Sequence, residues 1–178
     1  LKQMSGIPST GLFGLRFGAT LAAVSADRAP ERYGPLILWE PLPRGAAYMQ
    51  ELLRINLATQ MASYKEIRVN RKAMAASLAE GGKVNVDGYE LSGRLFREAQ
   101  GIDLLAGPRT YRGRTLILHL HRQAETLPQP IQQLGALYEQ ATLDKVAVEP
   151  FWKEIKAYVP ACRAAFDRTR QWLEGGPE

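Results

Sequence analysis

The stretch Gly14-Leu15-Arg16-Phe17-Gly18 decides the fold of this chain. It follows a short apolar run over residues 10–13 and opens a helix-like run over residues 19–26. A strand, a tight turn flanked by glycines and a helix form an elbow, in which a strained turn lifts one side chain above a sheet. The central side chain here belongs to Arg16, whose guanidinium stays protonated and offers only hydrogen-bond donors. The stretch therefore predicts an elbow whose central residue cannot act as a nucleophile.

Length and charge place the chain among ordinary globular proteins. Its 178 residues are enough for one domain with a real core, and 46% of them are hydrophobic and 23% charged. The net charge of +5 comes with scattered arginines rather than a basic segment interleaved with aromatics. A solvated basic surface therefore explains the charge, and we expect no nucleic-acid partner.

The single cysteine, Cys162, excludes an intrachain disulfide and predicts a reducing, cytoplasmic compartment. We expect it to be a buried small hydrophobe rather than a reactive thiol, because it shares a helical stripe with Val159, Phe166 and Leu173. No apolar run reaches the about 18 residues that a membrane span requires. The chain begins with Leu1 and shows no signal-peptide pattern, so we expect it to continue a longer sequence.

Four apolar runs predict strands at residues 9–13, 36–39, 115–120 and 145–149. Each precedes a segment that favours a helix, which is typical of a parallel sheet covered on both faces. Three amphipathic faces support this pattern: one over residues 45–64, one over 131–141 and one over 159–173. They are marked respectively by Met49, Leu52, Leu53, Leu57 and Met61; by Ile131, Leu134, Leu137, Tyr138 and Ala141; and by Val159, Cys162, Phe166, Thr169, Trp172 and Leu173. The chain is thus predicted to be a single α/β domain over residues 1–178.

Residues 44–108 separate the second and third predicted strands by far more than one crossover helix needs. They contain a long helical run, a second one over 71–80, the pair Gly81-Gly82 and a turn around Asp87-Gly88. We expect this excursion to be an inserted helical cap. No glycine pattern in the chain has the spacing that cradles phosphates, so no nucleotide or other cofactor is expected.

The order of these parts resembles the carboxy-terminal half of an α/β-hydrolase. Several short sequence stretches are similar to those of the exosortase-associated hydrolase-like proteins of bacterial exopolysaccharide loci. The stretches that carry the resemblance are Gly14-Leu15-Arg16-Phe17-Gly18-Ala19-Thr20-Leu21-Ala22, Leu38-Trp39-Glu40-Pro41, Asp87-Gly88-Tyr89-Glu90-Leu91-Ser92 and Pro150-Phe151-Trp152. The resemblance implies an ester or thioester hydrolase. It also implies that the first predicted strand lacks its earlier neighbour, so that a second copy or a preceding segment covers its edge.

The Ser-His-Asp positions that the resemblance implies have all changed. Arg16 stands at the nucleophile position, and Glu125 is the only carboxylate in the loop of residues 121–125 where the acid is expected. Residues 149–153, where the histidine is expected, contain none. The usual triad is therefore not supported, and the sequence predicts weak or absent catalysis.

The two histidines, His119 and His121, lie two residues apart at the end of a predicted strand, where they face the same side. We expect His119 to be packed and hydrogen-bonded, and His121 to be the better catalytic candidate, with Glu125, at the strand's carboxyl end. No third ligand stands nearby, so no metal site is predicted.

For Arg16 two interpretations stay open. It forms either a structural ion pair with Glu40, at the end of the neighbouring strand, or a bidentate clamp for an acidic or acyl ligand beside Phe17. Two functions stay open with them. One is a hydrolase that uses another serine or an activated water. The other is a non-catalytic binding protein that serves envelope polysaccharide or protein-sorting machinery.

Overall fold

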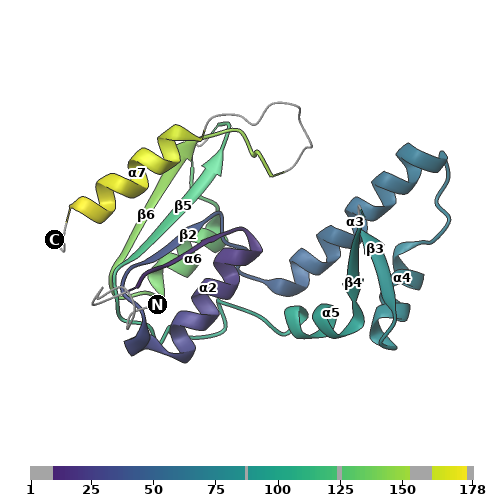
Figure 1. The fold of residues 1–178 in the computed structure, drawn as a ribbon, viewed down its shortest axis with the longest axis horizontal. Coiled ribbons are helices and arrows are strands. Elements are labelled where there is room, and N and C mark those ends of the chain that lie inside the picture. The colour runs from purple at the N-terminus through teal and green to yellow at the C-terminus, as the bar shows by residue number, and fades with distance from the viewer. Residues whose placement is uncertain (1–9, 87, 124–125, 153–161, 176–178) are drawn as a thin grey trace. The chain divides into compact units, whose positions relative to one another are not determined.

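The computed structural model describes residues 10–86, 88–123, 126–152 and 162–175 (Figure 1). The chain forms two compact units. Unit 1 comprises residues 1–43 and 104–178, and unit 2 comprises residues 44–103. Each unit has its own buried residues and its own sheet.

Unit 1 contains a four-stranded parallel sheet in the order β1-β2-β5-β6. Its strands are β1 (Leu12–Leu15), β2 (Leu36–Trp39), β5 (Thr115–His121) and β6 (Ala141–Ala147). All four residues of β2 and the first six of β5 are buried, which explains why their sequences are continuous apolar runs. The predicted parallel α/β architecture is confirmed. The predicted strands began three residues too early for β1 and four residues too late for β6.

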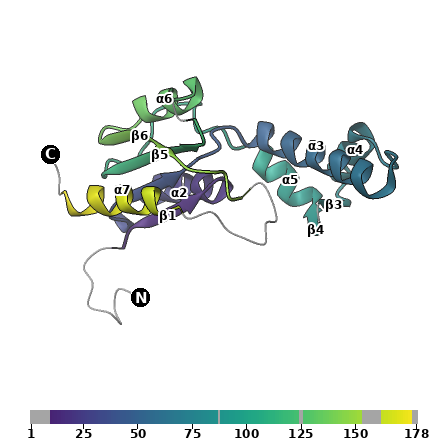
Figure 2. The same cartoon turned by 90° about the horizontal axis from the view of Figure 1, so that it is seen from above.

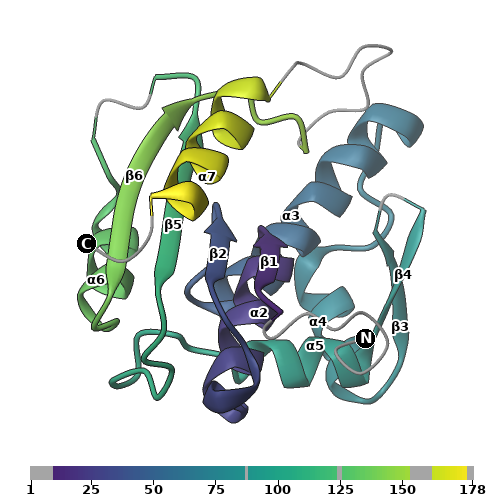
Figure 3. The ribbon, with the colours of Figure 1, turned by 60° about the vertical axis from the view of Figure 1, so that its left-hand side comes forward.

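Helices cover both faces of this sheet. Figure 3 shows α7 (Arg163–Glu174) in front of the strands, and α2 (Phe17–Arg28) and α6 (Gln129–Ala136) behind them. Seen from above, α6 and α7 lie on opposite sides of β5 and β6 (Figure 2). The 3-10 turn η1 (Pro30–Arg32) leads from α2 towards β2. The faces of the two inner strands, β2 and β5, are therefore buried, whereas the outer strands β1 and β6 keep partly exposed residues.

The predicted carboxy-terminal stripe is only partly correct. Ala165, Thr169 and Trp172 form the buried face of α7, whereas Phe166 and Leu173 are 59% and 43% exposed. The Trp39 indole N–H donates to Thr169 Oγ1 at 3.0 Å and thereby fixes which face turns inward. Cys162 is half-buried at the residue before the helix, and Val159 lies outside the described residues. The stripe over 131–141 also ends early, because Ala141 is already the first residue of β6.

A buried hydrogen-bond network lies at the amino ends of the strands. The carboxylate of Asp27, near the end of α2, pairs with Arg109 and accepts the backbone N–H groups of Thr110 at 2.9 Å and Tyr111 at 3.0 Å. Arg109 also donates to the Leu104 carbonyl at 3.0 Å, and its side chain is only 9% exposed. This network anchors the segment that leads into β5.

Unit 2 consists of α3 (Gly45–Tyr64), α4 (Arg71–Ala79), the antiparallel hairpin β3 (Lys83–Val86) and β4 (Tyr89–Ser92), and α5 (Gly93–Gln100). The sequence did not predict the hairpin, whose turn carries Gly88 at a φ of 89°. The buried apolar residues of this unit are Met49, Leu53, Met74, Leu78, Val86, Leu91, Phe96 and Ala99.

The predicted apolar face of α3 extends over only half of the helix. Met49 and Leu53 are buried, but Met61 is 46% exposed. The buried residue in the last part of the helix is Gln60, at 8% exposure. A polar side chain therefore organises the end of α3 where the sequence predicted an apolar one.

Candidate functional site

The turn between β1 and α2 places Arg16 in a strained backbone conformation. Its φ is 55° and its ψ is −123°, a region that non-glycine residues adopt at a cost of about 1–3 kcal/mol. The Arg16 N–H donates to the Trp39 carbonyl at 2.9 Å, and its own carbonyl accepts the N–H groups of Ala19 at 3.0 Å and Thr20 at 3.2 Å. The neighbouring strand and the first helical turn thus hold this residue at the strand's end.

The two glycines of the turn have different roles. A Cβ atom on Gly14 would lie 2.4 Å from the Gly18 carbonyl oxygen and 2.5 Å from the Ala19 nitrogen, so strand and helix approach too closely for a side chain. A Cβ atom on Gly18 would meet nothing within 4 Å. The close approach therefore requires glycine only at position 14.

Glu40 follows β2 directly, as Arg16 follows β1. The register pairs Leu15 with Trp39, so the two residues are next to each other in the same row across the sheet. Glu40 also has a positive φ, 46°, and its N–H donates to the Leu118 carbonyl at 2.7 Å. Two adjacent strands therefore end in left-handed residues at the carboxyl edge of the sheet, where parallel α/β folds bind ligands.

The Glu40 carboxylate is engaged by β5 rather than by Arg16. Its Oε2 atom lies 2.9 Å from His119 Nδ1 and accepts the Leu120 N–H at 2.8 Å. Both side chains are largely buried, at 16% exposure for Glu40 and 9% for His119. Of the two interpretations of Arg16, the structure does not show the ion pair with Glu40 and instead pairs Glu40 with His119, whereas the expectation that His119 is packed and hydrogen-bonded is confirmed.

His119 and His121 face the same side of β5, as predicted. Their rings stack, with centroids 5.9 Å apart and an angle of 8° between the planes. His119 presents Nδ1 to a carboxylate, so Nδ1 carries a proton, and in the neutral form of the ring Nε2 is then the acceptor. His121 is exposed, and its Nδ1 lies 3.1 Å from the Gln123 backbone nitrogen and 3.2 Å from the Gln123 carbonyl oxygen. A carboxylate on the neighbouring strand thus holds His119, whereas His121 contacts the backbone of the turn that follows β5.

An aromatic residue beyond β6 reaches Arg16. The Arg16 Cζ atom lies 5.7 Å from the centroid of the Trp152 ring, within the range of a cation–π contact. Trp152 packs edge-on against Phe151, with centroids 5.1 Å apart. The Trp152 indole nitrogen is buried without an acceptor among the described residues. Arg16 is itself half-buried, as is Phe17 at the first position of α2.

The catalytic candidate Glu125 lies outside the described residues. Glu149, which follows β6, pairs with the exposed Arg122. Over residues 10–86, 88–123, 126–152 and 162–175, no group of three His, Cys, Asp or Glu side chains is arranged to hold a metal ion. The same residues contain no helix that is long and apolar enough to cross a membrane.

The sequence missed the part that His119 plays at this edge. The partner of His119 is Glu40, which lies 79 positions earlier in the sequence. The register that aligns Trp39 with Leu118 brings these two residues together. The alternation of His119 and His121 was the one available signal, and it indicated a shared face without identifying a partner.

No family model and no curated protein matches this chain. Its likeness is to solved structures of the α/β-hydrolase fold. It aligns with alpha/beta hydrolase domain-containing protein 10 from mouse at a TM-score of 0.55 and 12% identity, over 98% of this chain and 66% of that one.

Two bacterial structures agree. A thermophilic esterase from Thermogutta terrifontis, solved with malate bound, gives a TM-score of 0.55 at 15% identity, over 99% of this chain and 69% of that one. An alpha/beta fold family hydrolase from Bacillus anthracis gives 0.51 at 16% identity, over 98% and 69%. The chain thus spans about two thirds of the length of these neighbours, and it has an α/β-hydrolase fold.

Proposed function

We propose that this hydrolase-fold protein binds an acidic or acyl small molecule, through a carboxylate group of that ligand, at the turn between β1 and α2. The observation that carries the proposal is the backbone of Arg16, held at a φ of 55° at the position that ends β1 and begins α2. Such strain persists only where the surroundings enforce it, and it occurs most often at functional positions.

The electrostatics of the turn favour an anion. A helix amino terminus presents backbone N–H groups and the positive end of the helix dipole. Arg16 adds a guanidinium whose planar fork matches the two oxygens of a carboxylate. The Glu40 carboxylate oxygen Oε2 already has hydrogen-bond partners on β5, His119 Nδ1 and the Leu120 N–H. Phe17, beside Arg16, supplies apolar surface for the acyl part of a ligand.

Calorimetric titration with malate tests this proposal, with the uncharged diamide of malic acid as the matched ligand control. Malate is a suitable probe because the Thermogutta terrifontis esterase, which shares the fold, was solved with it. We expect malate binding that is lost with the diamide and weakened about tenfold or more in Arg16→Gly, because a charge-assisted bidentate contact disappears. Arg112→Gly, at an exposed position outside the turn, should bind malate unchanged. Equal affinity in wild type and Arg16→Gly would contradict the proposal.

The second candidate function is hydrolysis of an ester or thioester by activated water. The Glu40–His119 pair favours it, because a carboxylate on Nδ1 leaves Nε2 free of a proton, as a general base requires. Water would attack the acyl carbon while Nε2 takes its proton, and the leaving alcohol or thiol would receive that proton as the bond to it breaks. Turnover of p-nitrophenyl acyl esters that disappears in His119→Gln would establish this candidate. Saturable anion binding without turnover would contradict hydrolysis and support the binding function.

The finer features expected from the sequence belong to this proposal. Unit 2 is proposed to be the cap insertion, since the chain leaves unit 1 after β2 and returns before β5. The edge of β1, the outer strand, carries Phe13 at 54% exposure, and a second copy or a preceding segment is proposed to cover it. We propose that the protein acts in the bacterial cytoplasm, in a process linked to exosortase or envelope polysaccharide. Size measurement of the purified chain tests whether a second copy covers the edge.

A further inference from the structure

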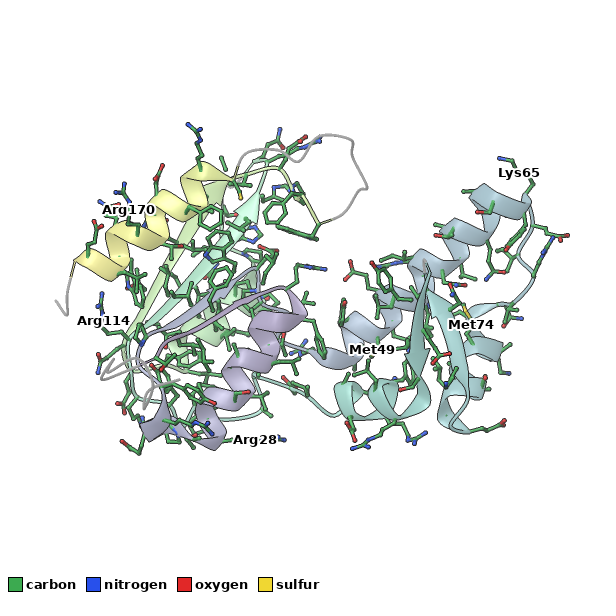
Figure 4. The ribbon with its side chains drawn as sticks, viewed as in Figure 1. Arg28, Met49, Lys65, Met74, Arg114 and Arg170 are labelled. Atoms are coloured by element: carbon green, nitrogen blue, oxygen red, sulfur yellow. The ribbon has the colours of Figure 1, made fainter. Side chains whose placement is uncertain are left out.

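One surface of unit 2 combines exposed apolar and basic side chains. Residues 61–73, at the end of α3, in the following loop and at the start of α4, are all exposed (Figure 4, where Lys65 is labelled). We call them the α3–α4 tip. Four of its side chains are large and apolar, with 46% to 51% exposure: Met61, Tyr64, Ile67 and Val69. Four others are basic, against one acidic residue, Glu66: Lys65, Arg68, Arg71 and Lys72.

The backbone of the tip is held in a defined conformation. The buried Gln60 side chain accepts the N–H groups of Arg68 at 2.8 Å and Val69 at 2.9 Å, and it donates to the Val69 carbonyl at 2.9 Å. A further hydrogen bond of 2.7 Å joins Gln60 to Asn56 on the preceding turn of α3. The loop around Ile67 and Val69 is therefore fixed from beneath by a polar side chain, and its apolar side chains remain outside the core of unit 2.

Both ends of the loop are capped. Lys65 ends α3 in the left-handed conformation, with a φ of 61°. The Asn70 side chain accepts the Ala73 N–H at 2.9 Å and begins α4. Between these caps the Arg68 guanidinium stacks on Tyr64, with Cζ 3.7 Å from the ring centroid. Arg68, which lies between the apolar residues Ile67 and Val69, therefore presents its cation together with the aromatic ring of Tyr64.

We propose that the α3–α4 tip docks on the surface of an anionic lipid bilayer. The interface of a bilayer accepts apolar and aromatic side chains at the level of the headgroups, while anionic headgroups attract Lys and Arg. A nucleic acid would bind the basic side chains through its phosphates but would gain little from the exposed Ile67 and Val69. The core of a protein interface is depleted in charged residues, above all Lys, whereas basic residues here alternate with the apolar ones. This inference goes beyond the proposed ligand site, which lies in unit 1.

Co-sedimentation of the full chain with phosphatidylcholine vesicles, with and without phosphatidylglycerol, tests the proposal. We expect binding to the anionic vesicles only, reduced by added salt because exposed charges are screened. Arg71→Gln/Lys72→Gln should weaken binding by about tenfold or more, since each basic residue near such a surface contributes about fivefold. The control variant Arg94→Gln/Arg170→Gln removes the same number of positive charges at exposed positions outside the tip. It should bind the vesicles nearly as tightly as wild type.

The apolar contribution has its own variants. Ile67→Ala/Val69→Ala should also weaken vesicle binding severalfold, whereas Leu95→Ala, at 45% exposure on α5, should not. Equal binding to vesicles with and without phosphatidylglycerol would overturn the proposal. Retention of a single-stranded oligonucleotide that Ile67→Ala/Val69→Ala leaves unchanged, without vesicle binding, would overturn it in favour of a nucleic-acid surface. Unfolding midpoints within a few degrees of wild type show that each variant is folded.

Discussion

The two edges of the sheet in unit 1, where the strands begin and where they end, each carry a largely buried hydrogen-bonded pair that includes a carboxylate, but the backbone conformation differs between the two pairs. At the amino edge, Asp27 and Arg109 join segments of ordinary conformation, and Asp27 also accepts two backbone N–H groups. At the carboxyl edge, Glu40 and His119 meet beside two residues of positive φ, Arg16 and Glu40. The contrast separates a pair that stabilises the fold from a pair that lies at a strained edge.

The same contrast appears in what each edge could lose. Removal of Asp27 or Arg109 at the amino edge leaves its partner as an unpaired buried charge. The candidate ligand site at Arg16 does not depend on this pair. Removal of Arg16 at the carboxyl edge relieves strain, so function and stability should change in opposite directions there. Variants at the two edges therefore test whether the carboxyl edge is maintained for ligand binding.

The largest effect is expected from Asp27→Ala. This change leaves the Arg109 guanidinium, at 9% exposure, without its carboxylate and should lower the free energy of unfolding by about 3–5 kcal/mol. Urea denaturation measures the loss. Glu139→Ala removes the exposed partner of Arg112 and should cost less than about 1 kcal/mol. Similar losses in the two variants would contradict a buried pair at the amino edge.

A smaller loss is expected from Glu40→Ala. The change deprives His119 Nδ1 and the Leu120 N–H of their acceptor, and unsatisfied buried donors cost about 1–3 kcal/mol. Urea denaturation again gives the number, with Glu98→Ala, an exposed partner of Arg94, as the matched control. A stability equal to that of the control variant would show that the Glu40–His119 pair does not hold β2 against β5.

Arg16→Gly should change stability in the other direction. Glycine adopts positive φ without penalty, so relief of strain at Arg16 outweighs the entropic cost of glycine by about 1 kcal/mol. Thermal unfolding should show a raised midpoint. Gly14→Ala should lower the midpoint, because its Cβ atom would lie 2.4 Å from the Gly18 carbonyl oxygen. A lowered midpoint in Arg16→Gly would mean that the turn is not strained.

The smallest effect concerns pH and Tyr138. Burial raises the pKa of Tyr138 above its usual value, an effect that nearby Arg109 opposes, and burial also raises the pKa of Tyr111. Because the unfolded chain ionises first, the stability that neutral tyrosine provides is complete below about pH 10 and falls as the pH rises through the folded pKa. Tyr138→Phe should be nearly neutral at pH 7, since its hydroxyl has no partner among the described residues. The variant should lose less stability than wild type above pH 10, while Tyr89→Phe, at 81% exposure, should follow wild type.

The sequence predicts strands best where both faces are buried. β2 was predicted with its observed bounds, because four apolar residues stand between Pro35 and Pro41. The bounds of α3 were predicted correctly, but the predicted buried face was wrong in its second half, since Met61 is exposed and Gln60 is buried for its hydrogen bonds instead. β6 was displaced because Ala141 fits a helical period as well as a strand.

The candidate site divides in the same way. A local pattern predicts the turn at Arg16, because glycine spacing and the change from strand to helix are written in adjacent residues. The contact between Glu40 and His119 was not predicted, because it depends on side-chain direction after a residue of positive φ. No periodicity in a single chain specifies that direction.

Titration of malate into wild type and Arg16→Gly, together with their thermal midpoints, tests the central claim most directly. The claim is that the strained turn keeps Arg16 in place to bind an anion. We predict that Arg16→Gly has a higher midpoint and an affinity for malate lower by about tenfold or more. A variant that is less stable and binds malate as tightly as wild type would contradict it.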